Sequence, residues 1–414
     1  MKIINYENLE KEFFVCNEFE GTESVSQIIK EVKIHGDAAV IEYSNKFGDG
    51  NLKTLELTQE EIQQALGSVS DEFLEAVKTS IANVKTFAQK QFLSINNIEI
   101  NLNDAILGHT IIPLKSTGAY VPGGNYPLPS SAVMSVVPAK VAGVEEVIVC
   151  SPKIKPETIV AAHLAGADRI FRVGGVQAIA AMAYGTESIP KVDKITGPGN
   201  KYVTAAKKEV YGICGIDFLA GPSEIMIIAD ETSNPDFVAA DMLAQCEHDT
   251  DARAYLVTNS ANFVQKVEQS IQKFLPKLAT VEIATQSIEK SFAILVKNWD
   301  EAIQISNKKA PEHLEICFNG AEEFMPKFTN YGSLFIGNYS AEVLGDYCSG
   351  TNHVLPTNGA ARYTGGLSIF DFIKIQTYQE VKKGSSLFAT ASKLAQTEGL
   401  AAHKLSADLR NSRN

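Results

Sequence analysis

The sequence predicts an α/β fold made of two Rossmann-like parallel-sheet domains, with helical extensions at the N- and C-termini. Two observations carry this prediction. The chain has 414 residues, a length that suits two or three domains. After residue 106, short β-rich runs alternate with helical segments, and a second set of the same kind follows farther along the chain. Two such sets indicate two similar domains, although no clear sequence repeat relates them.

The N-terminal part, residues 22–93, is predicted to be helical. Thr58 and Glu61 have the spacing of a capping box, in which each side chain bonds the other residue's backbone N–H, so a helix is expected to begin there. Apolar residues then recur at about three to four positions, the helical period. These residues are Ile62, Leu66, Phe73, Val77 and Ile81.

The two α/β sets follow in order. The predicted strands of the first set are 118–121, 146–150, 169–173, 192–196 and 224–229, with helices such as 129–142 and 177–184 between them. The predicted strands of the second set are 252–258, 292–296, 314–318 and 333–336, with helices such as 235–247 and 261–275. The polar tail from about residue 375 is predicted to be helical. Such a tail packs on its own domain or reaches across to a partner subunit.

Composition and charge argue against several classes of protein. The formal net charge of −12 disfavours a nucleic-acid backbone or an anionic membrane as the main partner. The most apolar stretch, 132–150, is interrupted by a proline and three charged residues, so no membrane span is expected. The six cysteines form no CxxC pair, and the polar N-terminus has no signal-peptide pattern. Reduced thiols in the cytoplasm are therefore expected.

Three glycine-containing turns are predicted at the ends of strands in the first set. They read Tyr-Val-Pro-Gly-Gly at 120–124, Gly-Gly-Val-Gln at 174–177 and Gly-Pro-Gly-Asn at 197–200. Glycine lets backbone N–H groups approach a ligand closely, and a helix N-terminus adds partial positive charge, so such turns suit a pyrophosphate. Strand ends of one open sheet converge, which favours a nucleotide-like ligand. The usual Gly-x-Gly-x-x-Gly pattern is missing, and tight βα turns alone also explain the glycines.

Several side chains suggest a metal site. Gln245 and His248 lie three residues apart on a predicted helix, so they point to one face and are able to share an ion. Asp346 lies in a polar stretch, 345–353, that is predicted to be a functional loop. Nitrogen and oxygen ligands suit zinc. Helix capping by His248 and turn formation by Asp346 are the alternatives, and His353 is interpreted as a hydrogen-bonded core histidine.

Glu312 and His313 are a candidate acid–base pair. They follow Pro311 and precede a predicted strand. A carboxylate beside an imidazole supplies two groups with separable pKa values, which proton transfer near neutral pH requires. The alternative is an exposed Glu-His pair without a catalytic role.

Taken together, these motifs resemble those of the histidinol dehydrogenase family in order and spacing over nearly the whole chain. The matching segments are Gly-Pro-Gly-Asn at 197–200, Ala-Gly-Pro-Ser-Glu at 220–224, Gln-Cys-Glu-His at 245–248, Pro-Glu-His-Leu at 311–314, Gly-Asp-Tyr-Cys-Ser-Gly-Thr-Asn-His-Val-Leu-Pro at 345–356 and Glu-Gly-Leu-Ala-Ala-His at 398–403.

The resemblance implies a role for each matching residue. The implied zinc ligands, for one ion per subunit, are Gln245, His248, Asp346 and His403. The implied acid–base residues are Glu312 and His313. The implied substrate contacts are Ser223, Gln245, His248, His313, Asp346, Glu398 and His403, and the implied NAD contacts are Tyr120, Gln177 and Asn200. The resemblance also implies a homodimer in which the C-terminal arm of one subunit completes the site of the other.

The resemblance implies a zinc- and NAD-dependent oxidation of L-histidinol to L-histidine through bound L-histidinaldehyde, in the final steps of histidine biosynthesis. We expect an N-terminal arm at 1–20 and a first α/β domain with the metal and acid–base residues at 21–118 and 230–374. An NAD-binding second α/β domain is expected at 119–229 and a dimer-completing helical arm at 375–414.

Three other interpretations remain. A relative that oxidises another small alcohol would keep the zinc ligands but vary around Ser223 and Glu398, both present here. A non-catalytic metal- or nucleotide-binding protein would not need the acid–base pair. A thiol-dependent aldehyde dehydrogenase needs a nucleophilic cysteine in a strand-end loop, and neither Cys246 on a helix nor Cys317 in an apolar strand fits.

Overall fold

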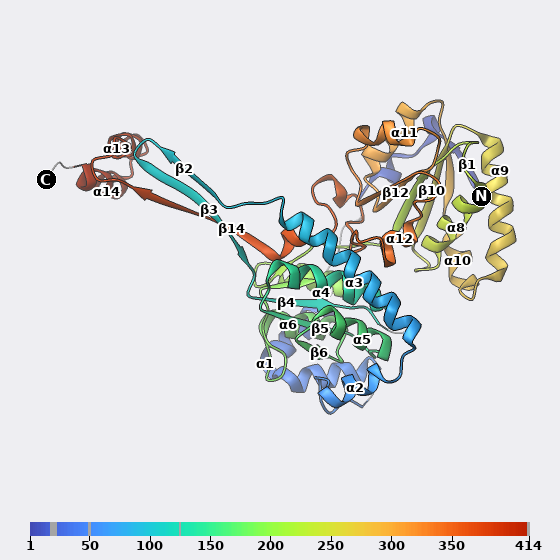
Figure 1. Cartoon of the computed structure of the whole chain (residues 1–414), viewed down its shortest axis with the longest axis horizontal. Helices are drawn as coiled ribbons and strands as arrows, with labels where there is room; N and C mark the ends of the chain where they lie inside the picture. The colour runs from blue at the N-terminus through green and yellow to red at the C-terminus, as the bar shows by residue number, and fades with distance from the viewer. Residues whose placement is uncertain (17–22, 49–50, 124–125, 412–414) are drawn as a thin grey trace.

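The computed structural model describes residues 1–16, 23–48, 51–123 and 126–411. It has two lobes, each built on a parallel sheet, and an arm that projects away from both (Figure 1). The predicted α/β class with two parallel-sheet domains is confirmed. Among the described residues, no helix has the length and apolar character needed to cross a bilayer.

The first lobe contains a five-stranded sheet in the order β6-β5-β4-β7-β8. Its strands are β4 (Ser116–Tyr120), β5 (Glu146–Cys150), β6 (Arg169–Phe171), β7 (Lys194–Thr196) and β8 (Gly215–Ile216), all parallel. Its connecting helices are α4 (Pro129–Ala142), α5 (Pro156–Ala165), α6 (Gly175–Tyr184) and α7 (Lys201–Val210).

The second lobe contains a six-stranded sheet in the order β1-β11-β10-β9-β12-β13. Its strands are β1 (Lys2–Asn5), β9 (Glu224–Ile228), β10 (Arg253–Thr258), β11 (Phe292–Leu295), β12 (His313–Ile316) and β13 (Ser333–Ile336), again all parallel. Its helices are α8 (Pro235–Cys246), α9 (Ala261–Phe274), α10 (Val281–Ile288), α11 (Trp299–Lys309) and α12 (Glu342–Tyr347).

The two sheets share one topology. Numbered along the chain within each lobe, the five strands of either sheet follow the order 3-2-1-4-5, and β1 adds one strand outside β11. This is the strand order of the doubly wound dinucleotide-binding arrangement without its sixth strand, with a crevice where the strand order reverses. The strand pattern of the sequence predicts two similar domains, and the shared strand order confirms this prediction.

Both faces of each sheet are covered, which accounts for the continuous apolar runs of the strands. In β5, Val147 and Val149 pack into the core under α4 and α5, whereas Ile148 and Cys150 pack into the core under α6 and α7. Cys246, on α8, is fully buried in the core of the second lobe.

The N-terminal helices form as predicted but pack on the other lobe. They are α1 (Glu23–Lys46), α2 (Gln59–Leu66) and α3 (Asp71–Phe92), and the capping box of Thr58 and Glu61 opens α2. The domain expectation grouped residues 21–118 with 230–374. Instead α1 packs against α6 and α7, α2 against α5, and α3 against α4 and α5, all in the first lobe. The reason is connectivity: α3 leads through β2 and β3 directly into β4.

Both chain ends depart from the predicted helical extensions. The first residues form β1, the edge strand beside β11, followed by short 3₁₀ turns at Tyr6–Asn8 and Lys11–Phe14. Near the C-terminus, β14 (Ile373–Val381) pairs antiparallel with β3 (Ala105–Pro113), which also pairs with β2 (Ile98–Leu102). Only then do the helices α13 (Leu387–Thr397) and α14 (Ala401–Asn411) follow. Residues 373–381 are extended because a distant strand supplies their hydrogen-bond partners.

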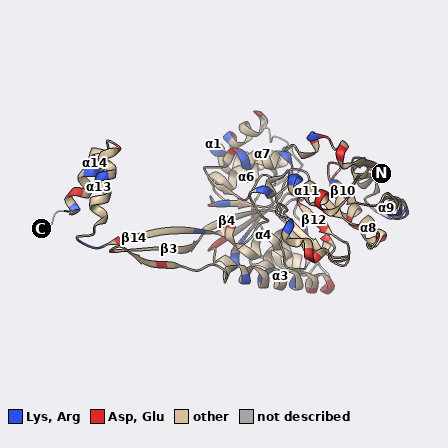
Figure 2. Ribbon diagram, turned by 90° about the horizontal axis from the view of Figure 1, so that it is seen from above, with Lys and Arg blue, Asp and Glu red and all other residues tan. Residues whose placement is uncertain are grey.

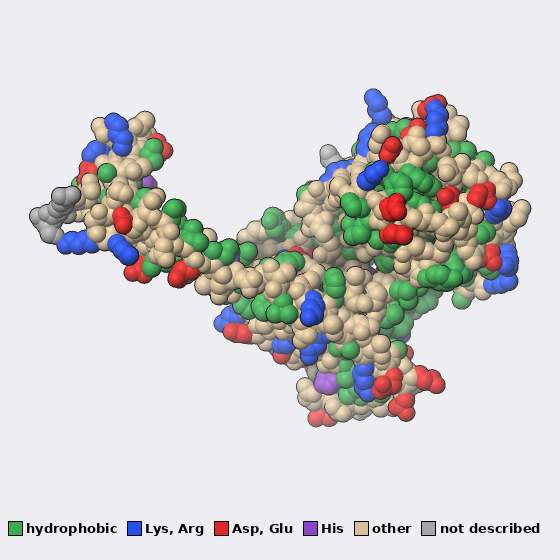
Figure 3. Space-filling view, turned by 45° about the horizontal axis from the view of Figure 1, so that its top comes forward, with side chains coloured by type: hydrophobic (Ala, Val, Ile, Leu, Met, Phe, Trp, Pro, Cys, Tyr) green, Lys and Arg blue, Asp and Glu red, His purple; other side chains and the backbone are tan. Residues whose placement is uncertain are grey.

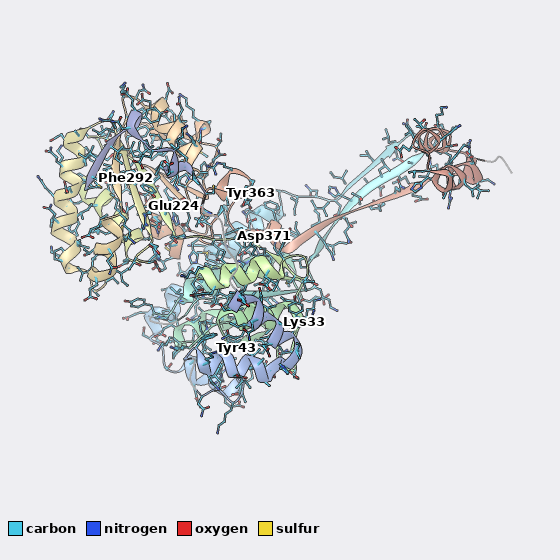
Figure 4. The ribbon with its side chains drawn as sticks, turned by 180° about the vertical axis from the view of Figure 1, so that it is seen from behind. Lys33, Tyr43, Glu224, Phe292, Tyr363 and Asp371 are labelled. Carbon is cyan, nitrogen blue, oxygen red and sulfur yellow. The ribbon has the colours of Figure 1, made fainter. Side chains whose placement is uncertain are left out.

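This three-stranded ribbon with α13 and α14 is the arm. It stands clear of the lobes in two perpendicular views, with the two helices at its far end (Figures 1 and 2). Asp371 lies where the ribbon leaves the lobes (Figure 4), and Lys194 donates to its backbone and side-chain oxygens at 2.8 and 3.0 Å. This ion pair ties the base of the arm to the first lobe.

Candidate active site

The acid–base pair lies at the amino end of β12, buried between elements of the second lobe. Glu312 is 5% exposed and His313 is 4% exposed, and Glu312 Oε2 lies 3.8 Å from His313 Nδ1. The backbone N–H of Glu224 donates to Glu312 Oε2 at 2.9 Å, which fixes this carboxylate at the start of β9. Glu224 is seen there in Figure 4. The alternative of an exposed pair is therefore excluded.

The metal-type residues surround the same imidazole. His313 Nδ1 lies 3.2 Å from Gln245 Oε1, and His313 Nε2 lies 3.7 Å from Asp346 Oδ1. The other Asp346 oxygen lies 3.9 Å from His248 Nε2. Gln245 is fully buried near the C-terminal end of α8, whereas the His248 side chain just beyond it is 46% exposed. The structure thus brings these four predicted residues together.

Asp346 is held by a short helix, and this differs from the predicted loop over 345–353. It lies in α12. The irregular segment that follows α12 carries His353, whose Nδ1 bonds the Asp346 backbone oxygen at 2.7 Å and whose Nε2 lies 3.2 Å from Ser131 Oγ. Burial lowers the pKa of His353. The interpretation of His353 as a hydrogen-bonded core histidine is confirmed, and it ties α12 to α4 of the first lobe.

Glu342 is a further residue of the site that was not predicted from the sequence. This residue is 1% exposed, lies one helical turn before Asp346 on α12, and places Oε1 3.4 Å from His313 Nδ1. Burial raises its pKa to about 8, although His313 opposes the rise. The available signal was the i, i+4 spacing of Glu342 and Asp346, which puts both on one helix face. Because residues 345–353 were predicted to be a loop, Asp346 was not placed on a helix with Glu342.

A second layer of carboxyl groups anchors α12. The backbone N–H of Glu342 donates to Glu315 Oε1 at 2.9 Å, and Glu315 is buried on β12 on the same side as His313. Burial raises the pKa of Glu315 well above its ordinary value, and burial raises that of the adjacent Asp241 to about 6. A shared proton between these two carboxyl groups would let them stay buried.

The electrostatics of the site are dominated by carboxylates. Burial raises the pKa of Glu312 to about 7, against the opposing effect of His313. Burial by itself lowers the pKa of His313, but the charges of Glu342, Glu312 and Asp346 outweigh it and raise the pKa to about 10. So many buried acids around one imidazole call for more positive charge than these side chains supply.

The donor set fits a divalent cation. His248, Glu342 and Asp346 each offer one ligand atom, and these atoms lie within 4.8 Å of one another. Gln245 Nε2, His313 Nε2 and both carboxylate oxygens of Glu342 are buried without a hydrogen-bond partner among the residues that the structure describes. Buried polar atoms that lack partners are costly, and a bound ion with its ligands would satisfy them.

Two predicted site residues lie elsewhere in this chain. Glu398 follows α13 and His403 lies on α14, both exposed at the far end of the arm (Figure 1). Ser223 is half-buried directly before β9, next to the residue that holds Glu312. A single subunit therefore brings Ser223 to the site but not Glu398 or His403.

The described parts of the three glycine turns, 120–123, 174–177 and 197–200, converge at the carboxyl end of the sheet in the first lobe, and Gly124 lies outside the described residues. The Gly175 N–H donates to the Tyr120 hydroxyl at 3.1 Å. Gly197 has a φ of +110°, and a Cβ there would lie 2.1 Å from the Tyr120 carbonyl oxygen. Gln177 is 1% exposed and donates to Ser44, while Asn200 caps α7 through its side-chain oxygen. β4 and β7 are neighbours where the strand order reverses, the usual nucleotide crevice.

The chain was compared with known proteins. The family model of histidinol dehydrogenase matches residues 16–411. Histidinol dehydrogenase from Clostridium acetobutylicum is 45% identical over 97% of this chain and 96% of its own, and that from Methanocaldococcus jannaschii is 45% identical over 92% and 90%.

Solved structures agree. Histidinol dehydrogenase from Elizabethkingia anophelis has a TM-score of 0.91 and 37% identity, covering 97% of this chain and 95% of that one. Betaine aldehyde dehydrogenase from Staphylococcus aureus, at a TM-score of 0.51 and 12% identity, covers 91% of this chain and 88% of its own and shares the fold alone. The resemblance inferred from the ordered motifs is confirmed: the chain belongs to the histidinol dehydrogenase family of oxidoreductases.

Proposed function

We propose that this protein oxidises L-histidinol to L-histidine in two NAD-linked steps and keeps L-histidinaldehyde bound between them. The observation that carries the proposal is the buried Glu312–His313 pair packed against a cluster of cation ligands. An acid–base pair beside a substrate-binding cation is what an alcohol oxidation followed by an aldehyde hydration needs.

His313 would serve as the base of both oxidations. Its Nδ1 faces the side-chain oxygens of Gln245 and Glu342, which leaves Nε2 without a hydrogen-bond partner among the described residues. Nε2 would accept the proton of the alcohol hydroxyl as hydride leaves the carbinol carbon for NAD. In the second oxidation it would accept a proton from the aldehyde hydrate as the second hydride leaves.

Glu312 would act between the two oxidations. With a pKa near 7, its carboxylate is a base strong enough to take a proton from water at neutral pH. The water oxygen then bonds to the aldehyde carbon, and the carbonyl oxygen takes the proton that His313 accepted in the first oxidation. The hydrate forms, and His313 is again able to act as a base. Holding the aldehyde in a buried site keeps this reactive group away from bulk water and other nucleophiles.

Zinc is the ion we propose for the cluster, with Gln245, His248 and Asp346 as ligands from one subunit. When bound, it would hold the imidazole and amino nitrogens of the substrate and so orient the carbinol carbon. A divalent charge beside Asp346 would also oppose the field of the carboxylates and lower the pKa of His313 towards the range in which it acts as a base.

The fourth ligand, His403, would come from a second copy of the chain. Hydrophobic side chains are exposed along the arm (Figure 3). They include Ile98, Ile100, Leu102, Ile375, Tyr378, Leu394, Leu400, Leu405 and Leu409. An apolar arm that carries Glu398 and His403 away from its own site supports a homodimer in which the arms are exchanged.

We also propose a cytoplasmic location, where the buried thiols of the chain stay reduced.

The test is the yield of NADH from NAD and L-histidinol, measured with the purified protein, after chelation, and after zinc is added back. Two NADH per histidinol, lost with the chelator and restored by zinc, are expected. A folded, zinc-loaded dimer that makes no NADH would refute histidinol as substrate and favour another small alcohol.

A further inference from the structure

We propose that Lys207 and Asp217 are positioning residues for NAD: a buried ion pair that fixes the Gly197 turn. The inference rests on the proposed function, in which this turn binds the dinucleotide. Lys207 lies on α7 and Asp217 follows β8, and their side chains are 3% and 0% exposed. They form an ion pair with each other.

The ion pair holds Gly197 from both sides. Asp217 Oδ2 accepts the backbone N–H of Gly197 at 2.7 Å, and Lys207 Nζ donates to the backbone oxygen of Gly197 at 3.0 Å. The other oxygen, Asp217 Oδ1, accepts the N–H of Phe218 at 2.7 Å, which fixes the carboxylate itself. Both polar backbone groups of one glycine are thus bonded to one pair of charges.

The turn needs such an external support. Gly197 has a positive φ and no space for a Cβ, so no side chain at this position is available to brace the turn. The next residues are Pro198, which has no N–H, and Gly199, where a Cβ would lie 2.3 Å from Val203 Cγ1. Asn200 and the first turn of α7 follow directly, so the Gly197 peptide sets the path of the chain into the helix N-terminus.

A gain in folding stability does not explain why an ion pair is buried here. Two buried charges lose their hydration, and apolar residues of similar size often serve a core equally well. The pair bonds Gly197, which directly follows β7 and lies against the Tyr120 carbonyl oxygen at the end of β4. Its four oriented bonds instead specify the geometry of one turn, and precise backbone geometry is what recognition of a pyrophosphate requires.

The experiment separates positioning from folding by using Asp217→Asn and the double variant Lys207→Met/Asp217→Asn in the full-length, zinc-loaded protein. The first leaves Lys207 buried without a counter-charge and should lower the unfolding midpoint. The second has no unpaired buried charge and should recover that midpoint. Both should raise the KM and Kd for NAD by about tenfold, the effect of one lost charge-assisted hydrogen bond.

The KM for histidinol, the kcat at saturating NAD and the zinc content should stay within about twofold of the parent protein, because the second lobe is untouched. Lys208→Met, at the exposed neighbouring position on α7, is the matched control and should leave NAD binding unchanged. A double variant that regains stability together with normal NAD binding would overturn the inference, as would equal losses for NAD and histidinol.

If the double variant does not fold, Asp217→Asn decides. Its side chain keeps the size of the original but has an NH2 group in place of one of the two oxygens that accept from Gly197 and Phe218, so the support of the turn is weakened. NAD affinity equal to that of the parent protein would refute the positioning role. Absence of NAD binding by the parent protein would instead refute the proposed function, so the two failures are distinguishable.

Discussion

One imidazole among buried acids defines the site at the scale of single residues. His313 faces Glu312, Glu342 and Asp346 at 3.8, 3.4 and 3.7 Å. Its two nitrogens differ: Nδ1 is held by protein oxygens, whereas Nε2 is buried without a hydrogen-bond partner among the described residues. In the proposed mechanism, Nδ1 would orient the ring and Nε2 would transfer the proton.

Replacing His313 by Asn should lower kcat by about a thousandfold, the usual range for loss of a general base, while zinc stays bound. Steady-state rates together with metal analysis check this. His35→Asn, an exposed position on α1, is the control and should behave as the parent protein. Loss of zinc from the His313 variant would show that this residue is a ligand rather than the base.

If Glu312 is the base of the aldehyde hydration, as proposed, this step should have its own pH dependence. The carboxylate is the active form, and its pKa is raised to about 7, so the rate from L-histidinaldehyde should fall as the pH is lowered through about 7. Glu312→Gln should remove this step and leave the alcohol step, so the NADH yield should approach one per histidinol. A full yield of two from this variant would argue against the role.

The Glu342→Gln variant distinguishes two roles for this carboxylate, as a partner of His313 or as a metal ligand. If it pairs with His313, Glu342→Gln removes a negative charge beside the imidazole, and the pKa of His313 should fall. The pH profile of the alcohol step should then shift to lower pH while the zinc content is unchanged. Loss of zinc with an unshifted profile would show that Glu342 ligates the metal, which its place in the cation cluster also permits.

At the scale of single elements, short-range interactions fix the start of α2 and link this helix to the first lobe. The chain enters α2 through a complete capping box, with Thr58 N–H to Glu61 at 2.8 Å and Glu61 N–H to Thr58 at 3.2 Å. Because Glu61 also pairs with Arg172 in front of the Gly174 turn, α2 is linked to the first sheet. The helix thus connects the N-terminal segment to the predicted nucleotide crevice.

Thr58→Ala should lower the free energy of unfolding by about 1 kcal/mol, because it leaves an N–H at the start of α2 without its acceptor. Denaturant titration measures the change. Thr79→Ala, in the exposed middle of α3, is the control and should change it by only a few tenths of a kcal/mol. An equal loss in both variants would mean that the cap contributes nothing specific.

At the scale of the whole molecule, the arm places Glu398 and His403 away from their own site. Apolar side chains along the ribbon and on α13 and α14 are 42% to 66% exposed. Exchange of arms between two copies would both bury this surface and supply the missing ligand. The dimer would then be required for catalysis as well as for assembly.

Subunit complementation tests the exchange. A His313→Asn subunit and a His403→Ala subunit should each form inactive homodimers. In a mixed dimer, one site combines the intact His313 of one copy with the intact His403 of the other. Random mixing should therefore restore about a quarter of the parent activity, since half of the dimers carry one of two sites. No recovery would place His403 at the site of its own chain.

The sequence by itself determined the α/β class, most strands within a few residues, the capping box at Thr58 and the family. These features depend on periodicity, turn chemistry and ordered motifs, which are local properties of the chain. It also indicated Gln245, His248, Glu312, His313 and Asp346, because their neighbours carry specific motifs. What the sequence determined is thus what short stretches of chain encode.

Only the tertiary structure decided the rest. The strand at 373–381 forms because β3, far away in the sequence, supplies its hydrogen bonds, although its alternating β-branched residues were a usable signal. Packing alone placed α1–α3 on the first lobe, set Glu342 beside His313 and joined Lys207 to Asp217 under Gly197. Such contacts join residues whose separation along the chain carries no pattern, because burial and electrostatics act through space.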